Sequence, residues 1–190
     1  ASIHSKSGMS VREGENGKAE RFQALCDDML YQMKRYFDPS ITQPIIDMIR
    51  HPLDKFIQNK SNIFLKRLRK GRVVQGHGAL LPEHIYIQGE TVRLISPYEV
   101  YKKHSILDAA HDVATLMVEL LVDGEKELAE HFLQKYKESS KDRDLDSILP
   151  SYQTYCALKY GVLTCEKKVA LQDESLGTVA LEYFNLATRF

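Results

Sequence analysis

The chain has little that would place it outside the cytoplasm or on a membrane. Its 190 residues include only three cysteines, Cys26, Cys156 and Cys165, and no C-x-x-C pair. An odd number of cysteines without such spacing indicates reduced thiols in a cytosolic protein rather than a disulfide framework. No apolar run approaches the roughly 20 residues that cross a bilayer, and the first residues lack the apolar segment of a signal peptide. We therefore expect a soluble, cytoplasmic protein.

A net charge of one sign is also missing. The sequence has 26 Lys and Arg residues and 26 Asp and Glu residues, so its formal net charge at pH 7 is zero. Without a global positive field we expect neither nucleic acid nor an anionic membrane as a partner. The length suits one substantial core and is short for two. Residues 1–17, rich in Ser, Gly, Glu and Lys, are expected to form a flexible lead-in, and residues 18–190 a single domain.

Most of the chain carries the apolar spacing of amphipathic helices. The first helix is expected over residues 18–37. A second is expected to be interrupted at His51-Pro52, because proline lacks an N–H and disfavours helix before it, and then to resume until Gly71. From Ser105 onward, everything is expected to be helical. These later helices are predicted at residues 107–121, 125–139, 145–168 and 174–188.

Residues 72–100 differ, because they contain short runs rich in β-branched residues. The runs cover residues 72–74, 85–87 and 92–95. Gly89-Glu90 lies between the last two and is typical of a hairpin turn. The sequence therefore predicts an α+β protein that is mostly helical, with a small central β-hairpin region.

A loop in this β-rich part has the form of a phosphate-transfer site without its reactive groups. An apolar strand leads into Gly76-His77-Gly78, and a second strand follows a few residues later. Kinase-like enzymes place a carboxylate directly after such a His-Gly turn and an amide five residues further on. Here these positions hold Ala79 and His84.

Residues 77–84, HGALLPEH, resemble the H-G-D-L-x-x-x-N loop of aminoglycoside phosphotransferase-type kinases, and are most like the subgroup fused to a P-loop ATPase. Ser96 stands where that family has its metal-binding aspartate. Residues 108–117 are similar to the family's D-x-x-x-D-L-A-x-L-x helix, and residues 183–187 to the stretch that closes the domain. A weaker likeness, around His4, is to the segment after the hinge between lobes. The likeness covers roughly residues 20–188.

The resemblance implies a protein-kinase-like C-terminal lobe whose catalytic motif is degenerate. The family's carboxylate orients the attacking hydroxyl, and Ala79 has no group that can do so. Mg²⁺ prefers oxygen ligands, whereas His84 offers nitrogen and Ser96 a neutral hydroxyl. ATP and Mg²⁺ are the family's cofactors. With this ligand set lost, we expect no cofactor, no metal site and no functional catalytic residue here.

Three residues match scaffold positions of the family. The resemblance implies that His77 packs beneath the loop and fixes its shape. It also implies that Asp112 accepts hydrogen bonds from the backbone of the loop. Asp108, four residues earlier, is expected to share the same helix face as Asp112.

Two parts of the family's arrangement do not occur in the sequence. The expected helices occupy most of the residues before His77, which leaves no room for the five-stranded N-lobe. No G-x-x-x-x-G-K-[ST] loop of a fused ATPase follows. The chain is therefore expected to be either a fragment or a free-standing half-kinase. Possible partners are a missing N-lobe, a fused or separate P-loop ATPase, or another protein.

Three functional hypotheses follow. The first is a catalytically inactive, pseudokinase-type domain that acts as a binding or regulatory module. The second is a divergent ATP-dependent small-molecule phosphotransferase in which Asp108, Asp112 or Glu99 has taken over metal or base duties. In the third, a partner chain supplies the missing carboxylates. Glu99 matches a glutamate of the fused subgroup, but the sequence does not reveal its role.

Two other clusters have simpler interpretations than a binding site. His77 and His84, and likewise His104 and His111, have a spacing that a transition-metal site could use, but loop packing is the favoured interpretation. The basic run Lys66-Arg67-Arg69-Lys70 could contact phosphate. A solvated last helical turn that complements the helix dipole is the favoured interpretation.

Overall fold

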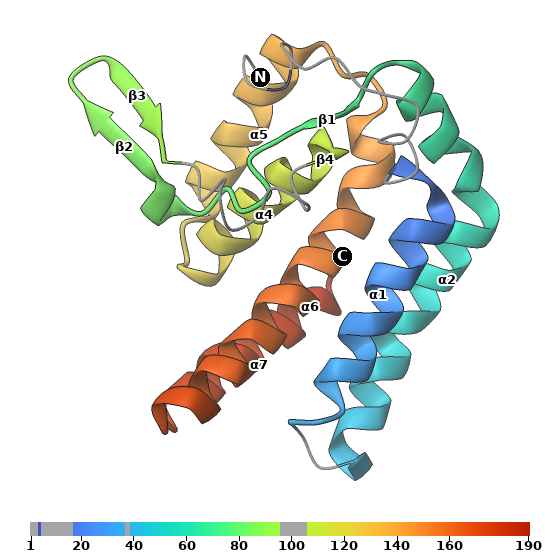
Figure 1. Ribbon diagram of the computed structural model, residues 1–190, viewed down its shortest axis with the longest axis vertical. Helices are drawn as coiled ribbons and strands as arrows, with labels where there is room; N and C mark the ends of the chain where they lie inside the picture. Colours follow the sequence, from blue (N-terminus) through green and yellow to red (C-terminus); the bar gives the residue numbers. More distant parts are fainter. Residues whose placement is uncertain (1–3, 5–16, 37–38, 96–105) are drawn as a thin grey trace.

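A computed structural model describes residues 4, 17–36, 39–95 and 106–190, which form a mostly helical α+β fold with two small antiparallel sheets. Helices α1 (Ala19–Met33) and α2 (Pro39–Arg69) lie side by side as a hairpin (Figure 1). On α1 the buried residues Phe22, Cys26, Leu30 and Met33 follow one helix face. That face packs against helix α6 (Leu145–Leu171), so the first helix is where the apolar spacing predicted it.

The predicted interruption of the second helix at His51-Pro52 is wrong. Helix α2 continues through Pro52, and its non-helical backbone angles occur at Lys60 (φ −126°, ψ 15°). One apolar stripe spans the proline and is almost fully buried: Ile46, Ile49, Leu53 and Ile57. Burial of this stripe outweighs the single hydrogen bond that proline removes, which is why the rule for isolated helices fails here.

The expectation that everything after Ser105 is helical is also wrong for three residues. Strand β4 (Ile106–Asp108) pairs antiparallel with β1 (Val73–Gln75), with Val73 opposite Asp108 and Gln75 opposite Ile106. The two partners are more than thirty residues apart in the chain. Local apolar spacing carries no information on such a pairing. The small sheet brings the start of the His-Gly loop next to the start of the following helix.

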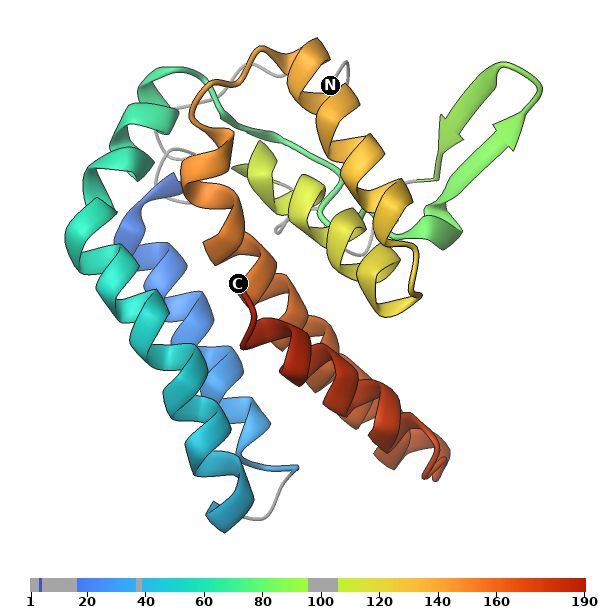
Figure 2. The same ribbon diagram turned by 180° about the vertical axis from the view of Figure 1, so that it is seen from behind.

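The central hairpin is confirmed. Strands β2 (Ile85–Gln88) and β3 (Thr91–Leu94) pair around a turn in which Gly89 has a positive φ of 59°. A short 3-10 helix, η2 (Pro82–His84), precedes them. The hairpin projects away from the helices, as the views from the front and from behind both show (Figures 1 and 2).

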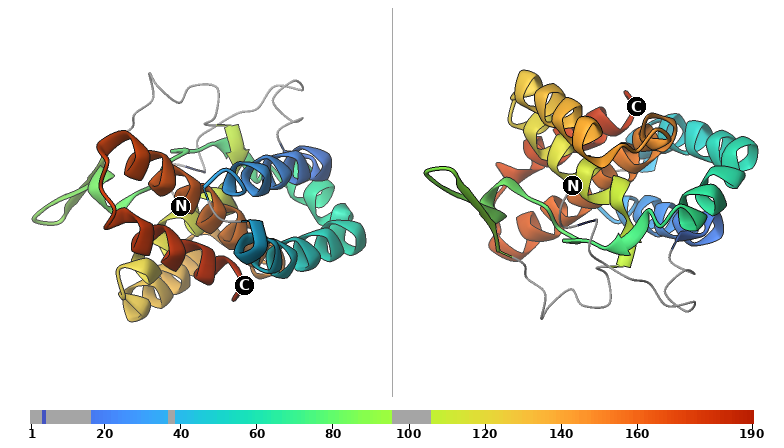
Figure 3. Two further views of the ribbon diagram at one scale, coloured as in Figure 1. Left: turned by 90° about the horizontal axis from the view of Figure 1, so that it is seen from below. Right: turned by 90° about the horizontal axis from the view of Figure 1, so that it is seen from above.

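The remaining helices are α4 (Ala109–Val122), α5 (Lys126–Ser140) and α7 (Leu176–Ala187). Helices α4 and α7 pack against α6, and α5 packs against α4. Helix α6 contacts α1, α4 and α7, and end-on views show it among the other helices (Figure 3). Gly161 of α6 admits the ring of Phe184, since an added Cβ would lie 2.6 Å from its Cε1 atom. Within the described ranges, none of these helices is both long and apolar enough to span a membrane.

Candidate functional site

The His-Gly loop lies directly over the first turn of α4. Strand β1 leads into Gly76, where an added Cβ would lie 2.5 Å from Oδ2 of Asp112. Only glycine can approach the carboxylate this closely. Gly78 adopts a positive φ of 81°, which turns the chain towards η2. Both glycines therefore allow a tight loop to sit on one acidic side chain.

Asp112 holds this loop by its backbone. Its Oδ2 accepts a hydrogen bond from the N–H of His77 at 2.6 Å, and its Oδ1 accepts one from the N–H of Gly78 at 2.9 Å. The side chain of Asp112 is fully buried. This is the type of contact that the family resemblance implied for the residue. Both oxygens are thus occupied by the loop and do not face solvent.

His4 contacts the same carboxylate from a distant part of the chain. Its Nε2 donates to Oδ2 of Asp112 at 3.0 Å, and its Nδ1 lies 2.9 Å from the hydroxyl of Tyr136 on α5. A carboxylate only accepts, so in the neutral imidazole Nδ1 accepts from the tyrosine. Around His4 the sequence shows only a weak family likeness, which does not indicate this contact.

The surroundings of Asp112 stabilise its charged form. Burial alone raises the pKa of a carboxyl group. For Asp112, interactions with the imidazoles of His111 and His4 outweigh burial and hold the pKa well below its usual range. The carboxylate therefore remains ionised as the acceptor for the loop.

A second buried acidic residue, Asp108, is held by Arg67. The guanidinium Nε and Nη2 of Arg67 donate to the two oxygens of Asp108, both at 2.7 Å. The same guanidinium donates to Asp142 at 3.0 and 2.9 Å. Arg67 has no exposed side-chain area, and each aspartate has 2%. This bidentate cluster ties α2 to the strand before α4 and to the α5–α6 turn.

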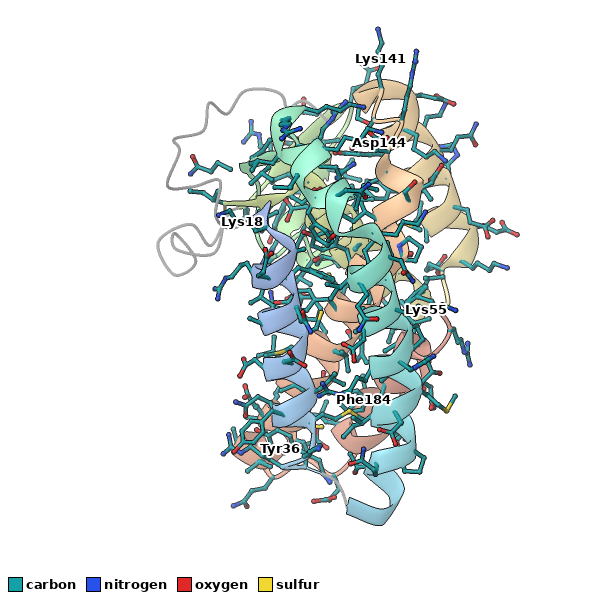
Figure 4. All side chains as sticks on the ribbon, turned by 90° about the vertical axis from the view of Figure 1, so that its right-hand side faces the viewer. Lys18, Tyr36, Lys55, Lys141, Asp144 and Phe184 are labelled. Atoms are coloured by element: carbon teal, nitrogen blue, oxygen red, sulfur yellow. The ribbon has the colours of Figure 1, made fainter. Side chains whose placement is uncertain are left out.

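These contacts correct two sequence-based expectations. The run from Lys66 to Lys70 is not a uniformly solvated helix end, because Arg67 is completely buried. Lys66 and Lys70 do lie at the surface, where each donates to Asp144 at 2.6 Å, and these bonds lower the pKa of Asp144 to about 2. Figure 4 shows Asp144 near Lys141 at one end of the molecule.

Asp108 also does not share a helix face with Asp112. It precedes α4 with extended backbone angles, and its Oδ1 accepts from the N–H of Ala110 as an N-cap. Aspartate is favoured at this position because it satisfies a free N–H of the first turn.

The two histidines of the loop use ring nitrogens to brace it. His77 is buried, and its Nε2 donates to the carbonyl oxygen of Ile95 at 2.8 Å. His84 donates from Nδ1 to the carbonyl oxygen of Ala79 at 2.8 Å, and the two rings lie 5.4 Å apart. His84 thus closes the loop onto its own backbone. Ser96, Glu99 and His104 lie outside the described residues.

An open cleft of about 1070 Å³ adjoins the loop. Gly78, Ala79 and His84 line it on the loop side, and most of the other lining residues lie on α1, β4, α4 and α6. Neither Asp108 nor Asp112 lines it. The cleft therefore adjoins the loop but is not lined by either of these two carboxylates.

Lys159 of α6 is a residue of the cleft that the sequence argument missed. Within the described residues no carboxylate lies within ion-pair distance of its Nζ, which lies 5.3 Å from the centroid of the Tyr160 ring. Burial lowers the pKa of Lys159. A signal was present in the sequence, because Lys159 is the single charged residue in the otherwise uncharged run 151–163.

Glu119 of α4 is the corresponding acidic residue of the cleft. Its Oε1 accepts a hydrogen bond from the hydroxyl of Tyr183 at 2.9 Å. Burial raises the pKa of Glu119 to about 7, and the tyrosine offsets only part of this effect. The cleft thus contains one carboxyl and one amine whose pKa values are both shifted towards neutrality by burial.

A metal centre has no support among the described residues, where no group of three or more His, Cys, Asp or Glu side chains could hold an ion. His77 and His84 do approach each other. His111, on α4, is instead buried beside Tyr152 and Tyr155, at ring distances of 6.3 and 5.9 Å.

Comparisons with known proteins give distant relatives. The chain is similar to uncharacterized proteins of two Mycobacterium tuberculosis strains and of Mycobacterium bovis, each 27% identical over 153 residues. The matched part covers 80% of this chain and 30% of each relative, so the chain spans about 30% of the length of these curated relatives. No family model matches the chain. No solved structure matches it.

Proposed function

We propose that this chain is a catalytically inactive, kinase-like lobe of the aminoglycoside phosphotransferase type that serves as a binding or regulatory module. The proposal rests on a contrast at one loop, between the groups that support its backbone and the side chains at the family's catalytic positions. Asp112, fully buried, supports the loop through the N–H groups of His77 and Gly78. At the loop positions where the family has its base and a metal ligand, the side chains are those of Ala79 and His84. The carboxylate that supports the loop is therefore present, whereas the loop itself carries neither a carboxylate base nor an amide metal ligand at these two positions.

A divergent phosphotransferase is less well supported. It requires Asp108, Asp112 or Glu99 to act as base or metal ligand beside the loop. Both oxygens of Asp112 bind the backbone, and both oxygens of Asp108 bind Arg67. Using either carboxylate would therefore leave buried donors unpaired, at a cost of about 1–3 kcal/mol for each donor and more for the charged guanidinium. The third candidate, Glu99, lies outside the described residues.

The projecting hairpin favours a binding role. In the β2–β3 register, Ile85 lies opposite Leu94 and Ile87 opposite Val92, so these four side chains share one face. Ile87 is 73% exposed and Val92 61%. An isolated two-stranded hairpin is marginally stable in water, and an entirely apolar face is typical of a contact surface. A separate N-lobe, an ATPase or another protein is the type of partner that we propose for it.

The proposal predicts that Mg-ATP will not stabilise this protein through the loop. We expect a change in melting temperature of less than about 1 °C in differential scanning fluorimetry with excess Mg-ATP, because specific binding at 100 times Kd would add about 2.7 kcal/mol to the stability. The variants His84→Ala and Ser96→Ala should behave like the unmodified chain. A clear shift that requires Mg²⁺ and is abolished by either variant would contradict the proposal.

A further inference from the structure

The cleft beside the loop contains a cation without a counterion. Lys159 reaches it from α6, among the aromatic side chains of α1 and α6. Four carboxylates also line the cleft, Asp28, Glu83, Glu119 and Glu166, and none of them forms a recorded ion pair with Lys159. By contrast, Lys168, nine residues further along α6, pairs with Glu174 at 2.7 Å. Lys159 therefore lines the cleft as a half-buried lysine without an ion-pair partner among the described residues.

An unpaired ammonium in a partly desolvated site is unfavourable. Burying a charge is costly unless it gains a partner, and half-buried Lys159 gains only the ring of Tyr160. The ammonium of Lys159 gains a partner when a ligand in the cleft supplies an anionic acceptor.

The wall next to Lys159 suits a planar group. Phe22 of α1 packs against Tyr152 and Tyr155 of α6, with ring centroids 4.8 and 6.0 Å apart, and all three residues line the cleft. Aromatic side chains favour offset or edge-to-face contact with a further ring. A ligand that combines a ring with an anionic group would meet both the aromatic wall and the unpaired cation.

We propose that this cleft binds a small aromatic anion, whose carboxylate, sulfonate or phosphate group pairs with the ammonium of Lys159 while its ring lies against Phe22, Tyr152 and Tyr155. This inference rests on the proposed binding function and deepens it by assigning a ligand class. It involves neither the loop backbone nor a metal ion.

Two fluorescent probes that differ in one charged group provide the test. 1-Anilinonaphthalene-8-sulfonate carries a sulfonate, and N-phenyl-1-naphthylamine has the same rings without it. We expect the unmodified chain to bind the sulfonate about 10-fold more tightly than the uncharged probe, because a hydrogen-bonded ion pair accounts for about one decade in Kd. Lys159→Met should remove this preference, and Lys159→Arg should keep most of it.

Lys167→Met is the matched control. Lys167 lines the rim of the same cleft on the same helix but is exposed, so its removal should leave the preference within about 2-fold. Lys159→Met should fold at least as stably as the unmodified chain, because it removes an unpaired, half-buried charge. A preference that survives in Lys159→Met, or is lost equally in Lys167→Met, would overturn the proposal.

Competition for the bound sulfonate probe tests the proposal on the unmodified chain, without any variant. Benzoate or phenyl phosphate should displace the sulfonate probe, and benzyl alcohol should not. The more effective competitor identifies carboxylate or phosphate as the preferred group. Equal displacement by the alcohol would contradict the inference. ATP binding that needs no Mg²⁺ and is lost in Lys159→Met would support this site and leave the proposed loss of kinase chemistry unaffected.

Discussion

Replacement of Arg67 by methionine is expected to destabilise the folded chain by about 3–5 kcal/mol, the largest effect that the structure predicts for a single residue. The guanidinium of Arg67 makes four hydrogen bonds to Asp108 and Asp142. Methionine fills a similar volume but leaves Asp108 buried without its cation and Asp142 with only the more distant Arg72, whose Nε lies 3.8 Å from Oδ2. The free energy of unfolding, measured by urea denaturation at pH 7, should fall accordingly.

Arg69→Met is the matched control for this prediction. Arg69 lies two residues further along α2 and is exposed, so its replacement should change the free energy of unfolding by about 0.5 kcal/mol or less. Arg67→Lys retains the charge but not the planar guanidinium that binds both carboxylates. Its free energy of unfolding should lie between those of the two methionine variants. Similar losses for Arg67→Met and Arg69→Met would show that the buried cluster does not hold α2, β4 and the α5–α6 turn together.

Asp112→Ala is expected to lower the free energy of unfolding by about 2–4 kcal/mol at pH 7. It leaves the N–H groups of His77 and Gly78 without their acceptor, together with Nε2 of His4. An unpaired buried donor costs about 1–3 kcal/mol, and partial relaxation of the loop reduces the sum. Asp47→Ala is the control, because Asp47 lies exposed on α2 and, in the described part of the chain, its carboxylate accepts a hydrogen bond only from Gln43.

The pH dependence of the same variant gives an independent test. The pKa of Asp112 is lower in the folded chain than in the unfolded chain, so its contribution to stability is fully present above the unfolded pKa, about 3.9. The contribution is lost as the pH falls below about 4 towards the depressed folded pKa. Urea denaturation between pH 5 and 2 should therefore show a shallower loss for Asp112→Ala than for the unmodified chain. If the free energy of unfolding fell equally with pH in both proteins, Asp112 would not have the lowered pKa that we assign to it in the folded chain.

Local patterns predicted the helices and the hairpin, but they failed where distant residues decide the structure. The turn at Gly89 and the apolar face of α1 depend on neighbours in sequence. Strand β4 depends on β1, and the unbroken helix at Pro52 depends on a buried stripe that packs against the rest of the core. These features arise from contacts that no local window contains.

The same distinction applies to the site. The motif indicated Asp112 and the loop correctly as neighbours, because their spacing is part of one recognisable pattern. Arg67 was interpreted as a solvated residue, because its partners Asp108 and Asp142 lie far along the chain. Lys159 belongs to no motif, and its only signal in the sequence is that it is the single charge in the run 151–163.

The central claim is that a kinase-like loop keeps the hydrogen bonds that support it but lacks the metal ligands and the catalytic carboxylate. Restoring the metal ligands to the loop tests this claim most directly. The measurement is Mn²⁺ binding, followed by electron paramagnetic resonance of the free ion, for the unmodified chain and for the triple variant Ala79→Asp, His84→Asn and Ser96→Asp. Mn²⁺ shares the preference of Mg²⁺ for oxygen ligands and is directly observable. We predict no saturable site in the unmodified chain and one site per chain in the triple variant. A saturable site in the unmodified chain that disappears in His84→Ala, or no gain in the triple variant, would contradict the claim.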